Sequence, residues 1–375
     1  MQKTLQYRLY PTKSVKRILE NQLSECCFIY NFCLSVRKTT YEQTDKSLNY
    51  YDFAKQLPDL KEAFPELKQV HSQVLQDVLK RNDKAYQNFF RRIKQGGAPG
   101  YPRYKNKDRY DSITYPQYGN GCSVEGSILH FSKTGDIKMV LHREIEGQIK
   151  TVTIRRTKTG KWFVSFVVET EPKRLPANGN AIGLDVGLKS FIKFNNNEDV
   201  ENPKFFKQDE IKLKKLQSRK DKETNGSRLR KTLSKRVTHL HEKIANKRKD
   251  FIHKISRKIV NKYEVIALER LNVKKMMEDS YFAKSIGDAA WTQFRMAVSY
   301  KAVEAGRKYI EVDPAYTSQT CSGCGTIKKL ELKDRVYKCE SCGLELDRDH
   351  NAAINILTVG MYSLNLTTGF RSPRL

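Results

Sequence analysis

The sequence has few acidic residues for its size and no long apolar segment. It carries 42 Asp and Glu side chains against 70 Lys and Arg side chains, so the formal net charge of its 375 residues is +28. We find no signal peptide, no apolar run of about 18 residues that could span a bilayer, and no basic amphipathic helix rich in tryptophan. These absences argue against a membrane partner and leave a nucleic acid as the expected polyanion.

Cysteine is sparse outside one cluster. Cys26, Cys27, Cys33 and Cys122 show no disulfide-framework spacing, and the first three lie in an apolar helical stretch where a free thiol packs as a small hydrophobe. Unpaired thiols indicate a reducing compartment, so we expect a cytoplasmic protein. The sequence also shows no internal repeat and no low-complexity tract.

The other four cysteines form two C-x2-C pairs near the C-terminus. Cys321 and Cys324 make the first pair, and Cys339 and Cys342 make the second after an interval of 14 residues. Two such pairs complete a tetrahedral Zn²⁺ site with no open position for substrate, which is typical of a structural zinc. The alternative is a set of disulfides or unrelated core thiols, and the spacing favours zinc.

The first half of the chain changes from a strand pattern to a helical pattern and back. Residues 1–10 alternate as a half-buried strand, and residues 12–97 have helical spacing. Strand patterns return at 138–142, 150–156 and 162–168, the last two as a hairpin. We expect strand 1–10 to join this sheet, the helices to be an insertion, and a domain boundary near 173–180.

The second half alternates strands with helices, which predicts an α/β domain. Apolar runs at 181–187 and 265–269 predict buried strands, and two long basic helices are expected at 205–222 and 227–260. A further helix reaches Gly306, a strand follows at 309–312, and the last helix starts near Asp349.

Three acidic residues lie where a carboxylate would be held rigidly. Asp185 and Glu269 are at or near strand ends, and Asp349 is at a helix start, where backbone amides position it. Together such groups can hold two Mg²⁺ ions about 4 Å apart and promote phosphodiester hydrolysis. Taken alone, each also fits a solvated loop start or, for Asp349, a helix N-cap, with Asp347 an equally good cap.

Motifs at these positions resemble the TnpB family, the transposon-encoded RNA-guided DNA endonucleases once called OrfB transposases, which are relatives of the type V CRISPR effectors. The most specific motifs are IGLDVG at 182–187, ALERLN at 267–272, YTSQTCSGCG at 316–325 and DRDHNAA at 347–353. Weaker similarity extends through 89–94, 101–105 and 241–250. The resemblance therefore covers most of the chain.

The resemblance implies an α/β RNase H-like (RuvC) nuclease domain with an inserted zinc ribbon, preceded by a wedge β-barrel with an inserted helical recognition domain. The boundaries we expect are 1–11 and 98–174 for the wedge, 12–97 for the recognition domain, 178–312 and 346–360 for the nuclease, 313–345 for the ribbon and 361–375 for a mobile tail.

The function implied by the resemblance is Mg²⁺-dependent, RNA-guided cleavage of double-stranded DNA by a protein encoded in an insertion-sequence transposon. The metal ligands fall on Asp185, Glu269 and Asp349, and a single centre would cut both strands. We expect a monomer with one guide RNA, associated with the nucleoid of a bacterium or archaeon. The alternatives are a DNA-joining transposase, a non-catalytic RNA-guided DNA-binding repressor and, less favoured, a junction resolvase.

Two basic stretches are candidate nucleic-acid contacts because they combine cations with aromatic rings or lie on a highly charged helix. The alternative is a solvated surface. The candidates are Arg91, Arg92, Lys94, Tyr101, Arg103, Tyr104, Lys105 and Arg109 in the first half, and Lys247, Arg248 and Lys249 in the second.

Overall fold

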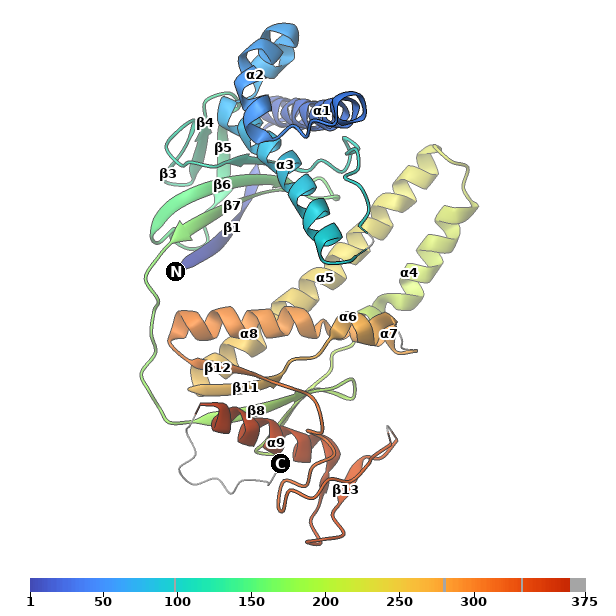
Figure 1. The fold of residues 1–375 in the computed structure, drawn as a ribbon. Coiled ribbons are helices and arrows are strands. Elements are labelled where there is room, and N and C mark those ends of the chain that lie inside the picture. The colour runs from blue at the N-terminus through green and yellow to red at the C-terminus, as the bar shows by residue number, and fades with distance from the viewer. Residues whose placement is uncertain (98, 279–280, 332, 365–375) are drawn as a thin grey trace. The chain divides into compact units, whose positions relative to one another are not determined.

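The computed structural model describes residues 1–97, 99–278, 281–331 and 333–364. The chain divides into two units, Met1–Glu171 and Pro172–Leu375, each with its own sheet and core (Figure 1). In the described part of the chain, no helix has both the length and the apolar character needed to cross a bilayer.

The first unit is built on a seven-stranded antiparallel sheet with the order β2-β6-β7-β1-β5-β4-β3. Its strands are β1 (Gln2–Tyr10), β2 (Ser112–Tyr115), β3 (Cys122–Glu125), β4 (Ile128–Phe131), β5 (Gly135–Val140), β6 (Gln148–Arg156) and β7 (Trp162–Glu169). Strand β1 pairs with β7 and β5, which confirms that the first ten residues join the later sheet. Leu5, Tyr7 and Leu9 alternate into the core, as their spacing predicts.

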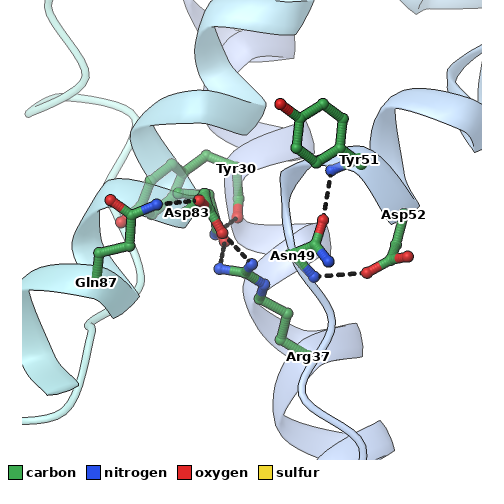
Figure 2. Close-up of polar contacts among 8 residues, drawn as sticks. Tyr30, Arg37, Asn49, Tyr51, Asp52, Asp83 and Gln87 are labelled. Carbon is green, nitrogen blue, oxygen red and sulfur yellow. Dashed lines mark hydrogen bonds and ion pairs between the residues drawn. The ribbon is translucent and has the colours of Figure 1, made fainter.

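Three helices and a short 3-10 turn lie between β1 and β2 in the sequence: α1 (Lys13–Thr44), α2 (Tyr50–Ala63), η1 (Pro65–Gln69) and α3 (Ser72–Lys94). The Thr12 hydroxyl caps α1 by accepting from the Val15 amide. The α2 helix begins with a capping box between Asn49 and Asp52. Figure 2 shows the Asn49 backbone amide donating to the Asp52 carboxylate and the Tyr51 amide donating to the Asn49 side chain.

Buried polar contacts join α1 to α3. Figure 2 shows the Arg37 guanidinium of α1 beside the Asp83 carboxylate of α3, to which it donates. Arg37 also donates to the Asn82 side chain at 3.2 Å, and the Asn82 amide donates to the backbone carbonyl of Tyr30 at 3.1 Å. These bonds engage both terminal nitrogens of a guanidinium that is only 4% exposed, and they hold α1 against α3.

The second unit contains a five-stranded mixed sheet with the order β10-β9-β8-β11-β12. The strands are β8 (Ala181–Val186), β9 (Ser190–Phe194), β10 (Asp199–Glu201), β11 (Val265–Glu269) and β12 (Lys308–Val312). Strands β8, β11 and β12 are parallel, whereas β9 and β10 form antiparallel pairs. The predicted α/β pattern is therefore confirmed for this unit.

Helices cover both faces of this sheet. One face packs against α5 (Arg228–Lys262) and α8 (Trp291–Ala305), and the other packs against α9 (Arg348–Ser363), as Figure 1 shows. Helices α4 (Phe205–Lys222) and α5 pair through a small core around Leu213, Leu240 and Ile244. The short helices α6 (Val273–Glu278) and α7 (Ala283–Ala289) precede α8.

A two-stranded ribbon, β13 (Val336–Lys338) paired with β14 (Glu345–Asp347), leads into α9. The sequence predicts a tail from residue 361, whereas α9 continues to Ser363, with Leu357 and Gly360 packed on the sheet side of the helix. Residues 365–375 of that predicted tail lie outside the described residues.

Candidate catalytic and metal sites

Asp185 and Glu269 lie on neighbouring parallel strands. The register pairs Leu184 of β8 with Leu268 of β11, so the next residue on each strand reaches the same edge of the sheet. Strand alternation turns Asp185 to the same face as Gly183, which is the face that α9 covers. The two carboxylates therefore lie side by side, with the α9 helix opposite them.

Gly183 allows α9 to approach β8 closely. A Cβ atom at this position would overlap the backbone carbonyl oxygen of Ala353 and would press on Leu357. Gly360 of α9 approaches the side chain of Ala267 in the same way. This close packing brings the first turn of α9, with Asp349, towards the end of β8.

The structure separates the roles of the two acidic residues at the start of α9. The Asp347 carboxylate accepts hydrogen bonds from the backbone amides of Asp349 and His350, both at 3.0 Å, and is the N-cap. The Asp349 carboxylate makes no capping bond and contacts the Arg348 guanidinium at 3.4 Å. Asp349 is thus available for another role, whereas Asp347 is not.

Negative charge accumulates where these groups meet. Burial, followed by the charges of Glu269 and Asp349, raises the pKa of Asp185 well above its ordinary value, and nearby Arg348 opposes this shift. Burial also raises the pKa of Glu269, which is 7% exposed, although a hydrogen bond from Thr317 lowers it in part. Buried carboxylates that repel one another would be stabilised in their charged form by a bound divalent cation.

The three carboxylates are not gathered as tightly as ligands of a single ion. In the portion of the chain that is described, only one group of His, Cys, Asp or Glu side chains has ligand atoms that all lie within 4.8 Å of one another, and that group is cysteine.

A buried hydrogen-bond network supports this site, and the sequence patterns did not reveal it. The Thr317 hydroxyl donates to the Glu269 carboxylate. The side-chain amide of Asn355 on α9 donates to the backbone carbonyls of Thr317 at 2.8 Å and Thr320 at 2.7 Å. The side-chain amide of Asn351 donates to the Thr320 carbonyl at 2.8 Å. The sequence carries one sign of this network, which is a pair of asparagines four residues apart on the otherwise apolar face of the last helix.

The four C-terminal cysteines meet in one cluster, as their spacing predicts. The Sγ atoms of Cys321 and Cys342 are 3.6 Å apart, and those of Cys324 and Cys339 are 3.5 Å apart. Sulfurs bound tetrahedrally at about 2.3 Å from Zn²⁺ would be about 3.8 Å apart, so these distances fit a zinc ion. They are far longer than a disulfide bond, and all eight cysteines are free.

The cysteine cluster is connected to α9. The Ser322 amide, inside the first C-x2-C pair, donates to the Asn351 side chain at 3.0 Å. Tyr337, which is fully buried beneath the cluster, donates its hydroxyl to the backbone carbonyls of Gln319 and Thr326. The ribbon is thereby fixed to the helix that carries Asp349.

The predicted nucleic-acid residues of the first unit occupy one helix end and the following loop. Arg91, Arg92 and Lys94 are exposed in the last turn of α3, and Arg103, Tyr104, Lys105 and Arg109 are exposed in the loop. Tyr101 differs, because its hydroxyl bonds that of Tyr86 at 2.8 Å and its ring packs edge-on against Phe89. Tyr101 therefore has a packing role as well.

Two of the three predicted nucleic-acid residues of the second unit already form ion pairs within the protein. Lys247 forms an ion pair with Asp209 at 3.5 Å, and Arg248 forms one with the buried carboxylate of Asp288 at 2.7 Å. Both contacts stabilise the packing of α5, so neither side chain needs a nucleic acid to explain its position. Lys249 is exposed.

Three family models match the chain. Residues 165–280 match the family described as "Probable transposase", residues 291–356 match "Cas12f1-like, TNB domain", and residues 1–46 match "Helix-turn-helix domain". The last stretch folds as β1 and the single continuous helix α1.

Two bacterial proteins named "Putative RNA-guided DNA endonuclease" are similar over nearly the whole chain. The one from Streptomyces pristinaespiralis is 30% identical and covers 100% of this chain and 93% of its own length. InsQ of Escherichia coli K12 is also 30% identical, covering 89% of this chain and 86% of its own length. A CRISPR-associated endodeoxyribonuclease, Cas12f1 of Sulfoacidibacillus thermotolerans, is 31% identical over 58% of this chain and 56% of its own.

The fold is similar to a solved effector structure. A chain of the "Cas12f1-sgRNA-target DNA complex" aligns with a TM-score of 0.60 at 17% identity, covering 95% of this chain and 98% of that one. A mini-RNA-guided endonuclease, Cas_phi3, aligns with a TM-score of 0.52 at 11% identity. At these identities the likeness establishes a shared fold.

Proposed function

The chain belongs to the TnpB family, the OrfB-type proteins of IS605 elements that are related to the type V CRISPR effectors, and we propose that it is an RNA-guided endonuclease that cuts double-stranded DNA. The observation that carries this proposal is the similarity to RNA-guided DNA endonucleases over the full length of the chain. Its partners are a guide RNA and a target DNA duplex, consistent with the net charge of +28.

The second unit is the nuclease, with an RNase H-like (RuvC) fold. Numbered within that unit, its strands are arranged 3-2-1-4-5. Strand 2 is antiparallel to strands 1 and 3, and strands 4 and 5 are parallel to strand 1. Residues 178–312 and 346–360 form this domain and 313–345 its zinc ribbon. Residues 1–11 and 98–174 form the wedge, and residues 12–97 form the recognition domain.

Asp185, Glu269 and Asp349 hold the catalytic Mg²⁺ ions. Their oxygen ligands, their burial and their mutual repulsion fit a divalent cation. Bound Mg²⁺ supplies activation of the attacking water and stabilisation of the leaving oxygen. The chain itself fixes the carboxylates: two lie on rigid strands, the third lies on a helix packed tightly at Gly183, and Thr317 orients Glu269.

Cys321, Cys324, Cys339 and Cys342 bind a structural Zn²⁺. All four ligands come from protein sulfur, which leaves no position for substrate or water. The ion's role is to hold the segment 317–322, and through Asn351 and Asn355 the α9 helix, in place.

A DNA-joining transposase is the second candidate, because residues 165–280 match a family described as a transposase. The same carboxylates could serve strand transfer. Incubating the protein with labelled transposon ends distinguishes the two functions: a nuclease leaves cut ends, whereas a transposase joins them to a target.

The proposed function is tested by expressing the protein with its native flanking DNA and sequencing the RNA that co-purifies. We expect one discrete RNA with a constant scaffold and a variable 3′ end. Changing that variable segment should redirect cleavage to a matching plasmid. A heterogeneous RNA mixture that high salt removes, with no redirected cleavage, would contradict the proposal.

A further inference from the structure

A basic cavity of about 400 Å³ lies in the first unit between α1, α3 and the loop that leads into β2. Tyr30 of α1 lines it, as do Arg81, Lys84 and Ala85 of α3 and Lys105 and Arg109 of the loop. The α3 residues are spaced at i, i+3 and i+4, so they share one face of the helix. This volume exceeds what a small inorganic anion needs and lies within the range of small-ligand sites.

The cations around the cavity differ in whether they are already engaged. Arg81 pairs with Asp77 at 2.6 Å and donates to the Ser112 carbonyl and side chain, so it belongs to the structure of the wall. Lys84, Lys105 and Arg109 form no ion pair with any described residue and are exposed at the rim. Three uncompensated positive charges around one opening favour an anionic ligand.

Acidic side chains do not neutralise this rim. Asp111 is the acidic residue in the lining, and its carboxylate accepts two hydrogen bonds from the Arg155 guanidinium, each at 3.0 Å. The Asp111 charge is therefore paired with Arg155 of β6 and not with the cations at the rim. The Lys105 ammonium lies 5.6 Å from the centre of the Tyr30 ring, which joins cation and aromatic surface in one wall.

The loop that carries the rim cations is held in place. The Asn31 side chain accepts from the Lys105 amide at 2.7 Å and donates to the Lys105 carbonyl at 2.8 Å. The Asn106 carbonyl accepts from the amides of Arg109 and Tyr110 at 2.9 and 3.0 Å. The backbone carbonyl of Tyr30 is fixed by the bond from the Asn82 side chain. Such a site loses little conformational freedom on binding.

We propose that this cavity binds one unstacked nucleotide of a nucleic-acid strand, with its phosphate at Lys84, Lys105 and Arg109 and its sugar and base inside, against Ala85 and Tyr30. Cations for the phosphodiester and a hollow of about 400 Å³ for the sugar and base supply the contacts that one nucleotide of a single strand needs. The inference rests on the proposed function only in requiring a nucleic-acid partner. Guide RNA and target DNA share this chemistry.

The test measures binding by the full-length protein, freed of nucleic acid, to fluorescein-labelled single-stranded RNA and DNA of one sequence over a range of salt concentrations. Ala85→Leu fills the cavity without changing charge, and Ala85→Ser is its control. Lys84→Ala with Arg109→Ala removes two rim cations. Its matched control, Lys55→Ala with Lys68→Ala, removes two exposed charges elsewhere in the same unit. The melting temperature verifies that each variant folds.

We expect Ala85→Leu to weaken binding about tenfold relative to Ala85→Ser, because leucine occupies the space of the base and removes the contacts of one nucleotide. The rim variant should weaken binding about tenfold beyond its control and lower the slope of log affinity against log salt by about 0.7. The probe that loses affinity, RNA or DNA, identifies the strand. If the rim variant binds both probes like its control, or a folded Ala85→Leu binds like Ala85→Ser, the proposal is wrong. Because cleavage is not the readout, absent guided cutting with these binding effects would contradict the proposed function alone.

Discussion

One hydrogen bond orients the carboxylate of Glu269, a proposed catalytic metal ligand. Glu269 is almost completely buried, and Thr317 is the side chain that donates to it. A carboxylate in this setting keeps one geometry only while its donor is present, and partners of metal ligands typically contribute a factor of about 10–100 to affinity or activity.

Thr317→Val should therefore impair the site without leaving a void, since the two side chains have nearly the same shape. We expect cleavage to fall at least about tenfold and the Mg²⁺ concentration for half-maximal cleavage to rise. Thr317→Ser restores the hydroxyl and should recover most of both. Equal Mg²⁺ dependence in all three proteins would show that the bond does not position Glu269.

The buried Lys301 should make the free energy of unfolding depend on pH. It is 4% exposed between α5 and α8, where its ammonium donates to the His253 carbonyl and the Ser256 hydroxyl. Burial, together with the charge of Arg257, lowers the pKa of Lys301 to about 8. The unfolded chain therefore binds more protons between about pH 8 and 10.4, and this group's contribution to stability rises with pH across that window.

Lys301→Met should remove that rise, which is at most about 3 kcal/mol. The measurement is calorimetric melting of wild type and variant between pH 7 and pH 10, comparing the slopes of melting temperature against pH. Other lysines titrate equally in both proteins. Parallel slopes would mean that Lys301 keeps an ordinary pKa in the folded state.

The arrangement of helices and strands depends on contacts that only small residues allow. Gly183 lets α9 lie directly on β8, and α9 in turn carries Asp349. An added methyl group would have to displace backbone rather than a flexible side chain, because the atom it would meet is the carbonyl oxygen of Ala353.

Gly183→Ala should destabilise the protein by about 1–3 kcal/mol and lower cleavage about 100-fold, since α9 must shift away from Asp185. Gly287→Ala in α7 is the control: its nearest neighbour is the Met277 side chain at 3.4 Å, and helix propensity favours alanine. Chemical denaturation and cleavage rates test both. A Gly183→Ala protein that melts and cleaves like wild type would show that this approach is not tight.

The zinc ribbon connects the proposed Zn²⁺ site to α9. Cys321→Ser should lower the zinc content from one ion per chain, measured by mass spectrometry, and lower the melting temperature, because Asn351 and Asn355 lose a fixed partner segment. Cys122→Ser, a buried thiol of the first unit, should leave zinc content unchanged. Full zinc occupancy in Cys321→Ser would contradict a four-cysteine site.

Sequence patterns predicted the elements whose periodicity is strong. Helix 205–222, strand 265–269 and the Cys321–Cys342 cluster agree with the structure. Helix α2 escaped prediction as a separate element, and strands β2, β3 and β4, with four residues each, are too short to show alternation. The Thr317–Glu269 bond joins residues 48 positions apart, so no local pattern contains it.

The molecule combines two units in one chain, and its excess of positive charge suits a protein that handles two kinds of nucleic acid. Full-length similarity to RNA-guided DNA endonucleases assigns the family. Asp347 and Asp349 offer the sharpest comparison, because they are two residues apart and only one caps α9.

The decisive measurement is guided cleavage and target binding by Asp349→Asn and Asp347→Asn, each loaded with its guide RNA. We expect Asp349→Asn to bind the target DNA as wild type does and to lose cleavage at least about 1,000-fold. Asp347→Asn should cleave normally, because asparagine is an equally good N-cap. Normal cleavage by Asp349→Asn, or its loss in a folded Asp347→Asn protein, would contradict the assignment of Asp185, Glu269 and Asp349 as the catalytic metal ligands.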